Sequence, residues 1–158
     1  MNFPFDLASE AQILIIDDEP ANIALLERLL RRERFDRIAS TTDPREATAL
    51  FTKHKADIIL LDLLMPHLDG FALLDQFTRL IGPDDFVPIL VLTADVTTET
   101  RRRALSLGAK DFLVKPIDTV ETVLRIVNLL ETRFLFKALK TATLENPAAQ
   151  PNDFPGLK

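Results

Sequence analysis

The chain of 158 residues has no cysteine, only two histidines and only four glycines. Without cysteine it has no disulfide framework, no thiolate zinc site and no cysteine nucleophile. His54 and His67 are too few and too far apart for a typical histidine metal site. The four glycines are not spaced to form a dinucleotide-binding loop or a P-loop, so the common nucleotide-binding motifs are excluded.

The charge balance and the lack of long apolar runs argue against nucleic-acid-binding and membrane proteins. The formal net charge is −5, and proteins that bind nucleic acid directly need clustered cations, so we expect no nucleic-acid partner. The first ten residues lack the basic and apolar segments of a secretion signal. No apolar run approaches the 18 or so residues that a membrane span needs. We therefore expect a cytoplasmic protein that does not bind membranes.

Short apolar runs alternate with segments of helical spacing along the chain. Continuous apolarity over four residues is typical of a strand buried on both faces of a sheet. We predict strands at 13–16, 38–40, 58–61, 89–92 and 111–114, and helices at about 20–33, 43–53, 70–80, 97–107 and 118–144. This alternation indicates an α/β fold, in which right-handed crossovers build a doubly wound parallel sheet.

Polar residues follow four of these strands. Asp17 and Asp18 come after the first, Asp62 after the third, Thr93 after the fourth and Lys115 after the fifth. The carboxyl ends of parallel strands share one edge, where ligands bind. Three carboxylates close together repel one another unless a cation binds or protons are taken up. A site with oxygen ligands and no histidine or cysteine favours Mg²⁺. A lysine and a hydroxyl suit a bound phosphoryl group, and aspartate can be a nucleophile, so we predict phosphoryl transfer.

Four segments resemble the receiver domain of two-component response regulators. They are ILIIDDE at 13–19, DLLMPHLDG at 62–70, LTA at 92–94 and DFLVKP at 111–116. The resemblance covers roughly residues 11–130. It implies a flavodoxin-like (βα)5 fold with strand order 2-1-3-4-5. It also implies a signalling domain rather than an enzyme, one that catalyses only its own phosphorylation and dephosphorylation.

The resemblance implies a role for each residue at the strand ends. Asp62 would be the phosphoacceptor, taking a phosphoryl group from a phosphohistidine on a histidine kinase or phosphotransfer protein. Lys115 would pair with Asp62 and then with the phosphoryl oxygens, and Thr93 would donate its hydroxyl to them. Thr93 and Phe112 would be the switch residues that move inward on activation. The peptide bond before Pro116 would be cis.

The resemblance also implies a set of ligands for Mg²⁺. Asp18 and Asp62 would bind the ion directly, and the backbone carbonyl of Leu64 would be a third ligand. Asp17 would hold the ion through a water molecule.

Simpler and competing interpretations remain open on the sequence alone. Asp17 and Asp18 would also suit a cap for the helix that begins at Pro20, and Asp62 or Thr93 a plain strand end. A haloacid-dehalogenase-type phosphatase also uses an aspartate nucleophile and Mg²⁺. It needs Asp-x-Asp after the first strand, where this chain has Asp-Asp-Glu. A third alternative is an interaction module that is never phosphorylated, against which the intact residue set argues.

Two nearby features are predicted to be structural. Asp69 would cap the third helix, and Gly70 would relax the loop before it. Arg101, Arg102 and Arg103 on the fourth helix would form a solvated face.

The last helix is longer than a receiver domain needs. Its 27 or so residues would span about 40 Å, with Val120, Val123, Val127, Leu130 and Phe134 on one apolar stripe. One interpretation is a single amphipathic helix with a frayed end. The other is a stalk that forms a homodimer or leads to an output domain or effector protein. Residues 128–135 resemble the linker helix after receivers that precede HD-GYP-type cyclic dinucleotide phosphodiesterase domains.

These observations predict the domain organisation. Residues 1–10 would be an N-terminal extension, 11–130 the receiver domain, 131–145 a helical stalk and 146–158 a disordered tail or linker. The cognate kinase, the signal, the output, the phosphoryl lifetime and the oligomeric state before phosphorylation are left open by the sequence.

Overall fold

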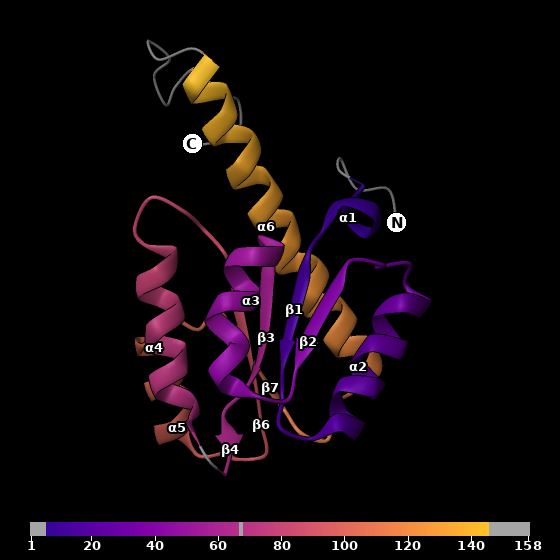
Figure 1. Cartoon of the computed structure of the whole chain (residues 1–158), viewed down its shortest axis with the longest axis vertical. Coiled ribbons are helices and arrows are strands. Elements are labelled where there is room, and N and C mark those ends of the chain that lie inside the picture. Colours follow the sequence, from indigo (N-terminus) through magenta and orange to yellow (C-terminus); the bar gives the residue numbers. More distant parts are fainter. Residues whose placement is uncertain (1–5, 67, 146–158) are drawn as a thin grey trace.

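A five-stranded parallel sheet forms the centre of the protein in a computed structural model, which describes residues 6–66 and 68–145 (Figure 1). The strands run in the order β2-β1-β3-β6-β7. Their bounds are β1 (Ile13–Ile16), β2 (Ile38–Thr41), β3 (Ile58–Asp62), β6 (Ile89–Thr93) and β7 (Asp111–Val114). Counted along the chain, this is the predicted order 2-1-3-4-5, so the doubly wound topology is confirmed.

The predicted helices follow the strands and cover both faces of the sheet. They are α2 (Pro20–Arg32), α3 (Ala47–His54), α4 (Gly70–Ile81), α5 (Thr98–Ser106) and α6 (Thr119–Glu145), with a short 3-10 turn η1 (Pro44–Glu46) before α3. Buried side chains of α2 and α6 pack on one face, and those of α3, α4 and α5 on the other. In Figure 1, α6 runs along the sheet and extends past the end opposite β4.

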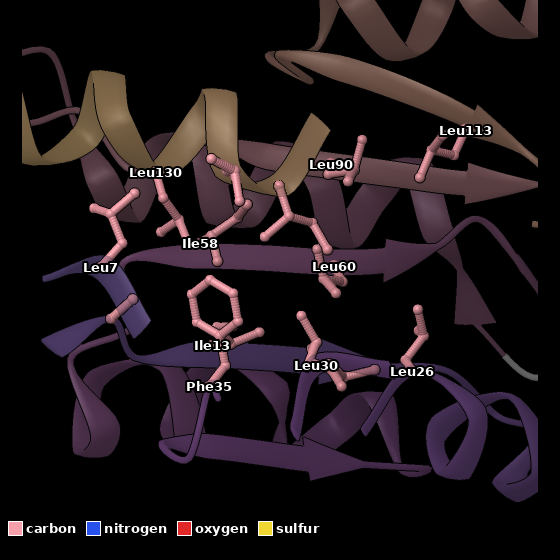
Figure 2. Packing of buried hydrophobic residues seen from close by; sticks show 14 of the residues in the cluster. Leu7, Ile13, Leu26, Leu30, Phe35, Ile58, Leu60, Leu90, Leu113 and Leu130 are labelled. Atoms are coloured by element: carbon pink, nitrogen blue, oxygen red, sulfur yellow. The ribbon is translucent and has the colours of Figure 1, made fainter. Parts of the chain in front are cut away.

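Alternation along the strands explains why the apolar runs are continuous. Successive side chains of a strand point to opposite faces, so Ile13 and Ile15 join the cluster under α2 and α6 while Leu14 and Ile16 join the other. All four are at most 2% exposed. Figure 2 shows the first cluster, in which Leu26 and Leu30 of α2 and Leu130 of α6 pack about the strands. The strands are therefore packed on both faces, and this packing fixes the positions of the residues at their ends.

Asp69 caps the helix it precedes, as predicted, because its carboxylate accepts the backbone N–H of Phe71 at 2.9 Å. Gly70 was predicted to relax the loop before this helix, and the structure shows a different reason for a glycine there. A Cβ there would lie 2.6 Å from Leu63 Cα, a distance that real side chains do not tolerate. The glycine therefore allows the chain to pass close to Leu63, directly after Asp62.

Two elements were not predicted. A helical turn, α1 (Leu7–Glu10), lies within the proposed N-terminal extension, and its Leu7 is 3% exposed in the cluster that contains α6. A small antiparallel hairpin joins β4 (Leu64–Met65) to β5 (Leu68–Asp69) in the loop after Asp62.

The long last helix is confirmed, and Val127, Leu130 and Phe134 of the predicted stripe are buried, but Val120 is not. Val120 is 67% exposed, whereas Thr122, Ile126 and Leu130 are fully buried. Residues four apart lie on the same side of a helix, and residues two apart on opposite sides. The sheet therefore receives the side marked by Thr122, and Val120 faces away from it. The predicted tail at 146–158 lies outside the described residues.

Within the described residues, none of the helices is long and apolar enough to cross a membrane.

Candidate functional site

The predicted polar residues meet at the carboxyl edge of the sheet. Asp17 and Asp18 follow β1, Asp62 is the last residue of β3, Thr93 the last of β6, and Lys115 follows β7. One carboxylate oxygen from each of the three aspartates lies within 4.8 Å of the others. The fold thus brings together carboxylates that are more than forty residues apart in the sequence.

Lys115 bridges two of these carboxylates. Its Nζ lies 2.9 Å from Asp17 Oδ2 and 3.5 Å from Asp62 Oδ1. The resemblance implies a pair with Asp62, and the lysine is in fact closer to Asp17. The peptide bond to Pro116 is cis, as the resemblance implies. Among the described residues, Lys115 thus pairs with two of the three clustered carboxylates, and the cluster keeps an excess of negative charge.

Asp62 is affected most by this crowding. Its side chain is 3% exposed, and burial is the main cause that raises its pKa to about 6, followed by the nearby charge of Asp17. The Lys115 ammonium and the backbone N–H of Leu64, 3.1 Å from Asp62 Oδ1, act in the opposite direction. Burial and like charge disfavour the ionised form, so the site gains stability from a bound cation or proton.

Asp17 is oriented by the start of α2. Its Oδ1 accepts the backbone N–H of Glu19 at 2.9 Å and the side-chain amide of Asn22 at 3.4 Å. The residue at the cap position of α2 is Glu19, whose side chain makes no cap hydrogen bond. Asp17 is therefore not the cap residue itself, although its carboxylate accepts the backbone N–H of that residue. Asn22 was not singled out from the sequence, although its place one turn into the helix puts it within reach of Asp17.

Thr93, the last residue of β6, is connected to the start of α5 through Asp95. It is fully buried, and its Oγ1 accepts the backbone N–H of Asp95 at 3.1 Å. Asp95 in turn accepts the backbone N–H of Thr97 at 2.9 Å and the hydroxyl of Thr100 at 2.7 Å. The bond from Asp95 uses the Thr93 oxygen as acceptor and does not consume the hydroxyl proton.

Two of the three arginines of α5 lie over aromatic rings. The Arg101 guanidinium is 5.1 Å from the ring centroid of Phe112, and that of Arg103 is 4.0 Å from the ring centroid of Phe71. Both arginines are exposed, as predicted, but they are more than a solvated face. Phe112 is 8% exposed and packs in the cluster under α3, α4 and α5. Contacts of this kind are worth about 0.5–1 kcal/mol at exposed sites.

The sequence profile of the family described as "Response regulator receiver domain" matches residues 13–127. The chain belongs to this family. It is 37% identical over 124 residues to response regulator GtcR of Aneurinibacillus migulanus, covering 78% of this chain and 49% of that protein. It is 38% identical over 122 residues to the transcriptional regulatory protein PrrA of Mycobacterium tuberculosis, covering 77% and 51%.

Solved structures agree with the fold of this receiver. The chemotaxis protein CheY4 of Vibrio cholerae superimposes with a TM-score of 0.68 at 28% identity, covering 77% of this chain and 99% of that one. The chain spans about half the length of the two curated relatives above. Receivers of this family are signalling domains of two-component systems, and none of the comparisons supports a haloacid-dehalogenase-type phosphatase.

Proposed function

We propose that Asp62 accepts a phosphoryl group from a phosphohistidine on a histidine kinase or phosphotransfer protein. The observation that carries this proposal is the cluster of three carboxylates bridged by Lys115 at the sheet edge. One Asp62 carboxylate oxygen would form a P–O bond while the P–N bond to the histidine breaks. The imidazole nitrogen keeps the electron pair of the broken bond, and the product on Asp62 is an acyl phosphate.

Lys115 and Thr93 would act on the transferred group. The Lys115 ammonium already lies 3.5 Å from Asp62 Oδ1, so it is placed to pair with phosphoryl oxygens attached to that residue. Thr93 ends the neighbouring strand and keeps a hydroxyl proton to donate. Charge-assisted hydrogen bonds of this kind stabilise developing negative charge better than water does.

The residues present fit Mg²⁺. Oxygen ligands without histidine or cysteine are those that Mg²⁺ prefers. Burial and the neighbouring Asp17 carboxylate raise the pKa of Asp62, so a nearby cation would stabilise its ionised form. Asp18, Asp62 and the backbone carbonyl of Leu64 would hold the ion directly, and Asp17 would hold it through water. A bound Mg²⁺ supplies positive charge for the phosphoryl oxygens.

Phosphorylation would act as a switch through Thr93 and Phe112. A Thr93 hydroxyl drawn toward the phosphoryl group would pull on Asp95 and so on the first turn of α5. Arg101 of the same helix covers the ring of Phe112. Phe112 therefore contacts α5 directly, and Thr93 is linked to it through Asp95. We propose that partners sense the surface formed by α5, β7 and α6.

The domain organisation and the partners of the chain are part of the same proposal. Residues 11–130 would be the receiver, 1–10 an extension, 131–145 a stalk and 146–158 a linker or tail. The stalk would form a homodimer or lead to an output domain or effector protein. Cytoplasmic localisation is part of this proposal.

The test compares the parent chain with Asp62→Asn, using a small acyl phosphate donor and Mg²⁺. We expect acid-labile phosphorylation of the parent and none of the variant, because an amide is not a competent nucleophile here. Asp69→Asn is the matched control, since it makes the same change at a nearby exposed carboxylate and keeps a capping side chain. Continued labelling of Asp62→Asn would contradict the proposal, and turnover of a small phosphate ester would favour a phosphatase.

A further inference from the structure

A buried arginine holds the second half of α6 against the sheet. It lies at the edge opposite the cluster of Asp17, Asp18 and Asp62, which we call the aspartate pocket. Arg133 is 8% exposed. Its Nε lies 3.1 Å from Asp57 Oδ1, and its Nη1 lies 2.7 Å from Asp85 Oδ1. Asp57 directly precedes β3, and Asp85 lies in the loop before β6. One side chain of the helix thus contacts two segments that are far apart in the sequence.

Asp57 is the centre of this contact. It is 3% exposed, and its Oδ2 accepts the backbone N–H of Gln12 at 2.9 Å. Its Oδ1 faces both Arg133 and Lys137, whose Nζ is 3.3 Å away. The carboxylate therefore joins the approach to β1, the start of β3 and two successive turns of α6. A buried carboxylate that lost these cations would be left with an uncompensated charge.

The loop between α4 and β6 holds the helix further along. The Arg133 Nη1 also donates to the backbone carbonyl of Phe86 at 2.9 Å. The Phe86 ring lies 6.2 Å from that of Phe136, and Lys140 Nζ donates to the carbonyl of Asp84 at 3.0 Å. These contacts recur at intervals of three or four residues, which is the spacing of one helix side. The docked part of α6 therefore reaches Lys140.

We propose that Arg133 clamps α6 to the receiver through Asp57 and Asp85, so that the receiver and the helix as far as Lys140 move as one rigid body. A hinge near residue 131 would separate Arg133 from both carboxylates and leave buried charges unpaired. A signal from the aspartate pocket then reaches the end of α6 only when the whole receiver reorients. The clamp does not rest on the proposed phosphorylation of Asp62.

The test measures the distance between the receiver and the end of the helix. Because the chain has no cysteine, spin labels can be attached at Ala24→Cys on α2 and Thr143→Cys on α6, both exposed positions. Labelled protein is diluted with unlabelled protein to suppress distances between chains. We expect one narrow distance distribution, unchanged when Mg²⁺ and beryllofluoride are added. In Arg133→Met the narrow distribution should be lost, and amide exchange in residues 134–145 should rise by roughly tenfold or more.

Arg125→Met is the matched control, because Arg125 lies on the same helix and pairs with Asp111 and Glu121 at a more exposed position. It should keep the narrow distribution. If Arg133→Met does not fold, Asp85→Ala replaces it as the test. This variant removes one partly exposed partner of Arg133 and should broaden the distribution partly. A narrow distribution in Arg133→Met, or in Asp85→Ala where that variant decides, would overturn the clamp.

A shift of the parent distribution on adding Mg²⁺ and beryllofluoride would overturn the rigid-body statement. Failure of the aspartate pocket to bind beryllofluoride would instead count against the proposed function. It would leave the comparison of Arg133→Met with Arg125→Met intact.

Discussion

Asp62 combines deep burial with a neighbouring carboxylate, and the resulting pKa of about 6 links the site to the stability of the fold. The ordinary pKa of an aspartate is near 3.8, so the folded chain binds this proton more tightly than the unfolded chain does. The contribution is fully present below about pH 4 and is lost as the pH rises through about 6. At neutral pH without metal, the ionised carboxylate therefore lowers the free energy of unfolding.

This linkage predicts the behaviour of Asp62→Asn in chelator. At pH 7.5 the variant should be more stable than the parent by about 2 kcal/mol, because a neutral amide carries no buried charge. At pH 4.5 the difference should be much smaller, since the parent carboxyl is then largely protonated. Urea unfolding of both proteins at the two pH values measures this. A stability difference that is the same at both would show that Asp62 is not the titrating group.

Saturating Mg²⁺ provides the control for that experiment. A ligand that binds only the folded state raises the free energy of unfolding, by about 1.4 kcal/mol for each tenfold excess over its Kd. The parent should gain this stability and Asp62→Asn much less of it, because the variant lacks one of the proposed ligands. The order of stability at pH 7.5 should therefore reverse.

At the scale of elements, the five main strands and the helices that follow them were predictable because their patterns are local. Runs such as 13–16 and 58–61 are short and apolar at every position, which is typical of a strand covered on both faces. The hairpin β4–β5 has two residues in each strand, too few for any periodicity. The site residues were predictable for the same reason, because they directly follow strands that local patterns reveal.

The clamp could not be predicted with the same rules. Arg133 in an otherwise apolar helix segment is typical of a solvated position, and its partner Asp57 lies 76 residues away. One signal was present in the sequence. Arg133 continues the spacing of Ile126 and Leu130 at intervals of four and three residues, so it falls on the buried side of the helix. Only the fold shows that two carboxylates meet it there.

The short helix α1 was missed because its stability comes from packing rather than from local sequence. Four residues are too few to form a helix alone, and α1 persists because Leu7 is buried against the cluster of α2 and α6. Leu7→Ala should lower the free energy of unfolding by about 2 kcal/mol or more. Leu105→Ala is the control, since Leu105 is 47% exposed and should change stability by less than about 1 kcal/mol. Equal effects in denaturant titrations would place α1 outside the cooperative unit.

At the scale of the whole molecule, the aspartate pocket and the free end of α6 lie at opposite ends of the sheet (Figure 1). The helix has 27 residues and spans about 40 Å, so a small rotation of the receiver displaces its end by several times as much as its base. A rigid arm therefore suits a switch that changes how two receivers, or a receiver and a partner, are arranged. It does not require any change within the arm itself.

A homodimer through α6 is the arrangement that this geometry makes testable. Leu135 is 56% exposed and Leu144 73%. Leu135 lies on the outer side of the docked part of α6, and Leu144 lies beyond Lys140. We expect sedimentation to show a shift from monomer toward dimer when Mg²⁺ and beryllofluoride are added together. Leu135→Glu should weaken the dimer at least tenfold, about 1.4 kcal/mol, because it places a charge in an apolar contact. It should leave beryllofluoride binding unchanged.

Leu105→Glu separates this dimer from one formed through α5, where Leu105 is exposed to a similar degree. Loss of the dimer in Leu105→Glu but not in Leu135→Glu would move the interface from the arm to α5 and contradict the stalk. A dimer in both the presence and the absence of beryllofluoride would make the arm contact permanent. Because the clamp fixes each arm to its receiver, such a dimer can respond to phosphorylation only through the angle between its two halves. Spin labels at Thr143→Cys in both chains would then measure that angle as a change in the distance between the two arm ends.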